Sequence, residues 1–160
     1  MSRYTPNPFN ADIDGDVRIA IIAAEWNSHI TSALTESCIT TLNDRGVAEE
    51  LIDVFHVPGA VELTFAASSI IETGAYDVVI VFGCVIRGGT PHFDYVCQSV
   101  TQGITHLNAE CDIPVIFGVL TVDTEQDALD RIGGSMGDKG AEAADTALKM
   151  YQFVQTVKDI

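Results

Sequence analysis

The stretch VRIAIIAA, residues Val17–Ala24, decides the fold class of this chain. It is a continuous apolar run rich in β-branched residues, as expected for a strand that is covered on both faces. Similar runs recur at Leu51–Val57, Asp77–Ile86 and Pro114–Leu120. None reaches about 18 residues, the length that a membrane-spanning helix needs. The sequence therefore predicts four strands of one buried sheet.

Segments with helical periodicity separate these strands. In His29–Arg45, apolar residues recur at every fourth position from Ile30 to Leu42, which places them on one face of a helix. The other predicted helices are 60–73, 92–111, a short one at about 124–132 and, after a glycine-rich break, 140–157. This alternation favours right-handed crossovers and a parallel sheet with helices on both faces. We predict an α/β fold, a three-layer α/β/α sandwich on a four-stranded parallel sheet, of the flavodoxin-like class.

The chain of 160 residues is of a size for one domain. The first 16 residues contain two of the five prolines and are predicted to form an N-terminal arm (1–16), followed by a single α/β domain (17–160). The beginning of the sequence lacks the apolar segment of a secretory signal. We therefore expect a cytoplasmic protein.

Charge and cysteine content exclude several functions. With 8 basic and 23 acidic residues, the formal net charge is −15. That charge argues against nonspecific binding to nucleic acid or to an anionic membrane, both of which require positive patches. The cysteines have no CxxC spacing and lie in apolar segments, so we predict reduced core thiols and no metal site. They are Cys38, Cys84, Cys97 and Cys111.

Ligands of parallel α/β sheets bind beyond the carboxyl ends of the strands, so the loops there are the candidate site. The first loop, Glu25–His29, holds the only tryptophan, Trp26. Trp26 is either a partly buried cover of the sheet edge or a platform on which a flat heterocycle stacks. The loop has no glycine, which makes it a poor phosphate cradle.

The second and third loops supply polar groups at helix starts. Glu62 falls in the first turn after Pro58-Gly59, where it complements the helix dipole, and the main-chain N–H groups at this helix start are free to bind polar atoms of a ligand. The third loop contains Gly88 and Gly89, which allow close approach of backbone amides to an anion. His92 follows, either as an exposed capping residue or as a proton-transfer group.

The last candidates follow the fourth strand. Phe117 is either a core residue or part of a site. Arg131 and Lys139, two of only eight cations, flank a glycine-rich stretch. They are either solvated surface charges or an anion clamp, a role that suits the arginine fork.

Four segments carry a resemblance to a known family. They are PGAVEL (Pro58–Leu63), GCVIRGGTPHFDYV (Gly83–Val96), PVIFGVLT (Pro114–Thr121) and DKGAEAA (Asp138–Ala144). In this order they resemble the lumazine synthases over nearly the whole chain from Val17. The resemblance implies condensation of 5-amino-6-(D-ribitylamino)uracil with 3,4-dihydroxy-2-butanone 4-phosphate. The products are 6,7-dimethyl-8-ribityllumazine, phosphate and water, and no metal or redox cofactor is implied.

The resemblance also implies a role for each matching residue. His92 is the proton-transfer residue, and Trp26, where the family often has Phe, stacks on the pyrimidine. The ribityl chain is held by Ala60, Val61 and Glu62. The backbone of Cys84, Val85 and Ile86 meets the pyrimidine edge. Phosphate is bound by Gly89, Thr90, Arg131 and Lys139. Phe117 is an aromatic residue supplied by a neighbouring subunit. Thr64 stands where the family commonly has proline.

The implied partners are the two small-molecule substrates, further copies of the chain and, as a candidate, riboflavin synthase. The family forms pentamers with shared active sites, and some members build a shell of twelve pentamers. The short connection from Arg131 to Lys139 favours the shell, whereas the net charge of −15 opposes it.

Two other functions fit the same scaffold. A flavodoxin-like electron carrier is acidic and α/β, but it needs a Ser/Thr/Gly-rich first loop, and EWNSH is not one. A noncatalytic flavin-binding or shell-forming protein is the second alternative. A response-regulator receiver is disfavoured because the third strand has no aspartate at its end.

Overall fold

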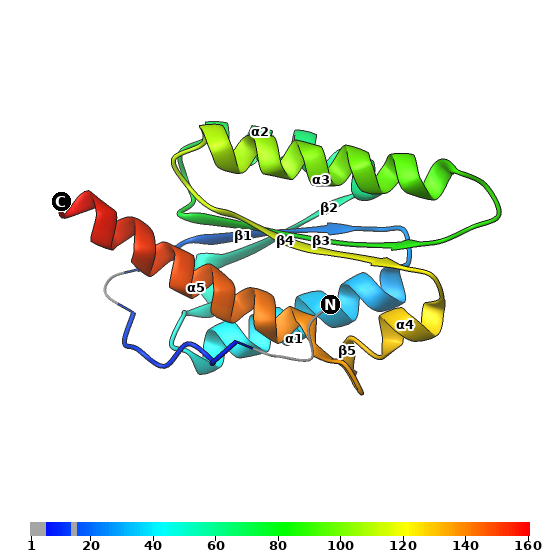
Figure 1. The fold of residues 1–160 in the computed structure, drawn as a ribbon. Helices are drawn as coiled ribbons and strands as arrows, with labels where there is room; N and C mark the ends of the chain where they lie inside the picture. The colour runs from blue at the N-terminus through cyan, green and yellow to red at the C-terminus, as the bar shows by residue number, and fades with distance from the viewer. Residues whose placement is uncertain (1–5, 14–15) are drawn as a thin grey trace.

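The fold is built on one four-stranded parallel sheet. The computed structural model describes residues 6–13 and 16–160. The strands are β1 (Ile19–Ala24), β2 (Ile52–Val57), β3 (Val78–Ile86) and β4 (Val115–Val122), in the order β2-β1-β3-β4 (Figure 1). The central strand β1 pairs in parallel with both neighbours, so that Ile21 lies opposite Val54 on β2 and Ile80 on β3. The predicted four-stranded parallel sheet is confirmed.

Helices cover both faces of this sheet and make the predicted three layers (Figure 1). They are α1 (Ser28–Asp44), α2 (Leu63–Glu72), α3 (His92–Glu110), α4 (Glu125–Leu129) and α5 (Lys139–Lys158). Helices α1 and α5 lie on one face, and α2 and α3 lie on the other. Each face has its own apolar core. In β3, Ile80 and Phe82 enter the first core, while Val79 and Val81 enter the second. This double burial explains why the strand is apolar at every position.

Two segments differ from the sequence prediction. The helix predicted from residue 60 begins as a separate 3-10 turn, Ala60–Glu62, before α2. The predicted glycine-rich break is a small antiparallel hairpin of β5 (Ile132–Gly134) and β6 (Gly137–Asp138), and the short helix before it ends at Leu129. The hairpin depends on positive φ angles at Gly133 (102°) and Gly137 (87°), which glycine adopts readily.

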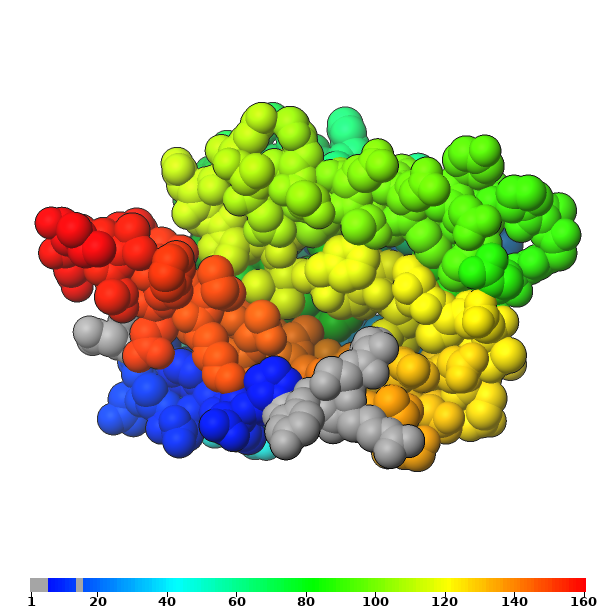
Figure 2. Space-filling model, viewed as in Figure 1, coloured from blue at the N-terminus to red at the C-terminus, as the bar shows by residue number. Residues whose placement is uncertain are grey.

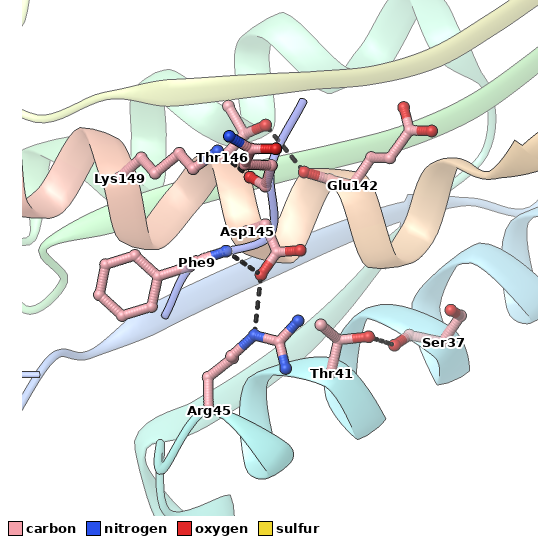
Figure 3. Close-up of polar contacts among 9 residues, drawn as sticks. Phe9, Ser37, Thr41, Arg45, Glu142, Asp145, Thr146 and Lys149 are labelled. Carbon is pink, nitrogen blue, oxygen red and sulfur yellow. Dashed lines mark hydrogen bonds and ion pairs between the residues drawn. The ribbon is translucent and has the colours of Figure 1, made fainter. Parts of the chain in front are cut away.

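The described part of the predicted arm packs on α5. Phe9 is buried in the first core, to which α1 and α5 contribute. Its backbone N–H donates to Oδ1 of Asp145 at 3.0 Å, and the Nε of Arg45 donates to the same oxygen at 3.0 Å (Figure 3). The Nζ of Lys149 donates to the carbonyl of Asn7. The rest of the predicted arm, 1–5 and 14–15, lies outside the described residues.

The helices and the cysteines can be compared with two further expectations from the sequence. Among the described residues, no helix is both long and apolar enough to cross a membrane. All four cysteines are free. Cys38 and Cys84 are core thiols as predicted, but Cys97 and Cys111 are only half-buried, since they lie on α3 and at its end, at the margin of the second core.

Candidate functional site at the strand ends and the β4 edge

The first two loops are joined to each other beyond the sheet. The backbone N–H of Glu25 donates to the carbonyl of Val57 at 2.8 Å, and that of Trp26 donates to the carbonyl of Pro58 at 3.1 Å. These bonds extend the pairing of β1 and β2 past the strand ends. Asn27 follows in the left-handed conformation (φ 57°), which asparagine tolerates better than most residues. Its Nδ2 donates to the carbonyl of Cys84 at 2.8 Å and ties the first loop to β3.

Trp26 and Glu62 come together at Gly59. A Cβ atom on Gly59 would lie 3.1 Å from Cδ1 of Trp26 and 3.2 Å from Oε2 of Glu62, so a side chain there would crowd both groups. Trp26 is 73% exposed. The interpretation of Trp26 as a partly buried residue that covers the sheet edge is therefore wrong within this subunit. Residues 25–29 and Pro58 line a surface hollow of about 510 Å³ at this point. The Trp26 indole therefore borders this hollow, and the Glu62 carboxylate lies near the indole at Gly59.

At the end of β3, the groups available to a ligand are backbone atoms, because the thiol of Cys84 is not reactive. Burial, and to a smaller extent the negative charge of Glu125, raise the pKa of the Cys84 thiol to about 11. The thiol therefore stays protonated at neutral pH. Val85 and Ile86 are half-buried. Ala60 is buried against the same strand, where a Cβ on Gly83 would lie 3.6 Å from its methyl group. Val61 is exposed.

The third loop is open. Gly88, Gly89, Thr90 and His92 are all exposed. A Cβ on either glycine would meet nothing within 4 Å, so packing within this subunit does not require glycine there. His92 is the first residue of α3, and its backbone N–H lies 3.4 Å from Oγ1 of Thr90. Space for a ligand therefore adjoins the start of α3.

The other predicted site residues, Phe117, Arg131 and Lys139, line a groove along the free edge of β4. The groove has a volume of about 680 Å³. Its lining includes Phe117, Arg131, Lys139, Glu142 and Thr146. In Figure 2, β4 (yellow) lies in the hollow between α3 (green) and α5 (orange). Phe117 is 43% exposed, so its interpretation as a core residue is wrong: β4 is an edge strand, and no further element of the described chain covers this side.

The two cations of the groove have different partners. The Nη1 of Arg131 donates to the carbonyl of Asp127 at 2.6 Å, while its Nε is buried without a hydrogen-bond partner. The Nζ of Lys139 lies 2.7 Å and 2.9 Å from the two carboxylate oxygens of Glu142. Sequence reasoning missed Glu142, although an acid three residues after a lysine in a helix is a recognisable pairing signal.

The predicted site residues therefore form two groups. Trp26, Glu62 and the loop 88–92 lie at the strand ends, and none of them lines the β4 groove. The four predicted phosphate ligands are divided, with Gly89 and Thr90 in the first group and Arg131 and Lys139 in the second. Within residues 6–13 and 16–160, no cluster of three or more His, Cys, Asp or Glu side chains is arranged to hold a metal ion.

Comparisons with known proteins agree on one family. The family model described as 6,7-dimethyl-8-ribityllumazine synthase matches residues 16–155. A protein of that name from Parabacteroides distasonis is 56% identical over 146 residues, 91% of this chain and 91% of its own length. Proteins of the same name are 50% identical in Phocaeicola vulgatus (89% of this chain, 85% of theirs) and 51% identical in Bacteroides fragilis (86% and 96%).

Proposed function

The chain belongs to the 6,7-dimethyl-8-ribityllumazine synthase family, and on that premise we propose that its active site is assembled between neighbouring copies of itself. The chain is an enzyme of riboflavin biosynthesis. It condenses 5-amino-6-(D-ribitylamino)uracil with 3,4-dihydroxy-2-butanone 4-phosphate to 6,7-dimethyl-8-ribityllumazine, phosphate and water. The proposal concerns where this condensation takes place and which residues carry it.

The separation of the two residue groups carries the proposal. One group, at the strand ends, has an exposed aromatic face, a carboxylate and an open glycine loop. The other, along β4, has an exposed aromatic ring and an arginine with an unsatisfied buried Nε. Each group offers only half of what the two substrates require. A symmetric oligomer brings the groove of one subunit to the strand ends of the next, because every copy presents both surfaces.

In the proposed site, the strand ends hold the pyrimidine substrate. Trp26 stacks on the ring, since a large aromatic face offers area and π contact to a flat heterocycle. Glu62 accepts hydrogen bonds from ribityl hydroxyls beside Ala60 and Val61. Backbone groups of residues 84–86 meet the pyrimidine edge, although the Cys84 carbonyl already accepts one bond from Asn27.

The phosphate substrate lies where the two halves meet. Amides of Gly89 and Thr90 approach it from the start of α3, where the helix dipole favours an anion. Arg131 and Lys139 of the neighbouring copy approach it from the groove, and Phe117 closes the pocket. The chemistry is then an amine addition to a ketone with loss of one water, elimination of phosphate, and ring closure with loss of a second water, with His92 moving protons.

Most of the rate enhancement is expected to come from holding the two reactants together. Effective molarity supplies up to roughly 7–11 kcal/mol of the barrier in well-oriented reactions. Proton transfer by a positioned imidazole adds about 10²-fold to 10⁴-fold. The test of the function is direct: purified protein with both substrates is expected to develop lumazine absorbance and release phosphate. A flavin-binding protein without catalysis would retain riboflavin but release no phosphate.

A shared site also predicts complementation between inactive subunits. His92→Ala damages the half at the strand ends, and Arg131→Ala damages the half in the groove. In oligomers that assemble at random from equal amounts of the two variant subunits, about a quarter of the sites combine two intact halves, so activity rises above that of either variant alone. A site contained within one subunit gives no such gain, and activity stays at the average of the two variants.

The proposed assembly is a pentamer, and the larger form to be tested is the shell of twelve pentamers. The hairpin β5–β6 supports the shell because it makes the connection between Arg131 and Lys139 compact. Sedimentation at low and physiological salt decides: a particle of five subunit masses at every salt concentration excludes the shell. Riboflavin synthase, which would consume the lumazine, remains a proposed partner, and the cytoplasm is the proposed location. Co-sedimentation of the two enzymes tests the partnership.

A further inference from the structure

Arg87 joins three elements at the edge of the proposed site. It follows β3 directly, and its backbone N–H donates to the carbonyl of Val122 at 2.9 Å. Its Nε donates to Oδ1 of Asp123, just after β4, at 2.7 Å. Its Nη1 lies 3.5 Å from Oδ1 of Asp94 in the first turn of α3, and the guanidinium carbon lies 4.2 Å from the centre of the Phe93 ring.

These contacts bracket the open loop of residues 88–92. Arg87 is the residue before the loop, and Phe93 and Asp94 are the residues after it. Within the loop itself, Gly88 and Gly89 have no neighbours that a Cβ would touch within 4 Å. Glycine leaves the backbone free to sample many conformations, so a loop of this kind needs to be fixed at its ends. Arg87 provides this connection from one end of the loop to the other and to β4.

The charges around Arg87 argue against a direct contact with substrate phosphate. The hydrogen bond to Asp123 raises the pKa of the guanidinium, which therefore carries its charge at all ordinary pH values. Two carboxylates already face this single positive charge, so the group of three carries a net negative charge. Asp123 occupies Nε and Asp94 lies 3.5 Å from Nη1, so a phosphate at this guanidinium would share it with two carboxylates. Arg131, whose guanidinium pairs with a backbone carbonyl and with no carboxylate in the described chain, is the better phosphate ligand.

We propose that Arg87 is a positioning residue, which holds the Gly88–His92 loop against β4 and the first turn of α3 so that the amides of Gly89 and Thr90 and the imidazole of His92 meet the phosphate substrate. This inference rests on the proposed function. It extends that function to a side chain that touches neither substrate. Its planar fork and its stacking on Phe93 are both required, and a lysine supplies neither.

The first experiment compares Arg87→Gln and Arg87→Lys with the wild-type enzyme and with Arg18→Gln. Arg18 is a matched control at the opposite end of the sheet. It is equally exposed (48%), pairs with Asp53 at 3.7 Å and lies over the Tyr76 ring at 5.6 Å. We expect both Arg87 variants to lose about 10-fold to 100-fold in kcat/KM, with a raised KM for the butanone phosphate and an unchanged KM for the pyrimidine. Arg18→Gln is expected to change neither KM.

The second experiment uses Asp123→Asn. The direction in which this variant changes the KM for the butanone phosphate distinguishes a positioning role of Arg87 from direct phosphate binding. If Arg87 positions the loop, loss of the Asp123 carboxylate loosens the loop and raises the KM for the butanone phosphate. If Arg87 binds phosphate, the same variant frees the arginine and lowers that KM. A lowered KM, or full activity of Arg87→Lys, overturns the proposal. Should Arg87→Gln fail to assemble, Asp123→Asn alone decides. An inactive wild-type enzyme would instead refute the proposed function.

Discussion

Lys139 and Glu142 form a close ion pair one helical turn apart at the start of α5, with side chains only 16% and 21% exposed. Both carboxylate oxygens accept hydrogen bonds from the lysine, at 2.7 Å and 2.9 Å. The ammonium charge is thus balanced within the subunit before any anion arrives. The Arg131 guanidinium, in the same groove, donates from Nη1 to the Asp127 carbonyl at 2.6 Å, and its buried Nε has no hydrogen-bond partner in the described chain. The two cations are therefore not equivalent candidates for binding phosphate.

This difference predicts unequal effects of removing the two cations. Arg131→Ala is expected to raise the KM for the butanone phosphate about 10-fold or more, because a charge-assisted contact is lost. Lys139→Ala is expected to raise it less, since its charge is already paired. Arg131→Lys is expected to rescue only in part, because a point charge lacks the fork. Steady-state kinetics with each substrate varied in turn measures this. Equal effects on the two substrates would mean a structural role for Arg131.

His92→Ala is expected to slow turnover by about 10-fold to 100-fold and to leave pyrimidine binding unchanged. The side chain is exposed at the start of α3, so its removal leaves no cavity in the core. The loss stops short of abolition because most of the rate comes from holding the reactants together. Single-turnover kinetics isolates the chemical step. A single-turnover rate equal to that of the wild type removes His92 from the mechanism.

Trp26 provides a spectroscopic test of the strand-end half of the site. It is the only tryptophan in the chain, so every change in indole emission is assigned to it. Its exposed indole is expected to be quenched when a pyrimidine substrate analogue or riboflavin stacks on it. Trp26→Phe is expected to keep activity, since a smaller aromatic face remains. Emission that is unchanged at saturating analogue would place Trp26 outside the site.

The close approach of Gly103 on α3 to Thr64 on α2 predicts that a larger residue at position 103 destabilises the protein. A Cβ on Gly103 would lie 2.2 Å from Oγ1 and 2.8 Å from Cγ2 of Thr64. Gly103→Ala is therefore expected to lower the free energy of unfolding by about 1–3 kcal/mol through overpacking. In a helix interior, alanine would otherwise stabilise by about 1 kcal/mol relative to glycine.

The matched background for this test is Thr64→Ala, which removes Oγ1 and Cγ2 and leaves Cβ as the nearest atom, at 3.0 Å. In that background, Gly103→Ala is expected to cost little or to stabilise, so the two substitutions are strongly non-additive. Urea denaturation of the four proteins measures the coupling. Additive effects would mean that helix packing adjusts and that Gly103 has no special role.

The sequence alone determined the four strands of the sheet and the main helices, and it directed attention to the loops after the strands. Buried parallel strands are apolar at every position, and this pattern is local, so it was readable at β1 and β3 without knowledge of their neighbours. Ligands bind at the carboxyl ends of such strands, which directed attention to Trp26, Glu62 and His92. The hairpin β5–β6 was not predicted, because its strands are too short to show any periodicity and Gly133 and Gly137 resemble a simple break.

Only the tertiary structure decided which apolar residues remain uncovered. Phe82 on β3 and Phe117 on β4 lie in similar apolar runs, yet Phe82 is fully buried and Phe117 is 43% exposed. The cause is the strand order: β3 lies between β1 and β4, whereas β4 is an edge. That order follows from how the crossover helices pack, which no local pattern encodes. The same long-range packing joins Arg87 to Asp123 across 36 positions of chain and divides the predicted ligands between two surfaces.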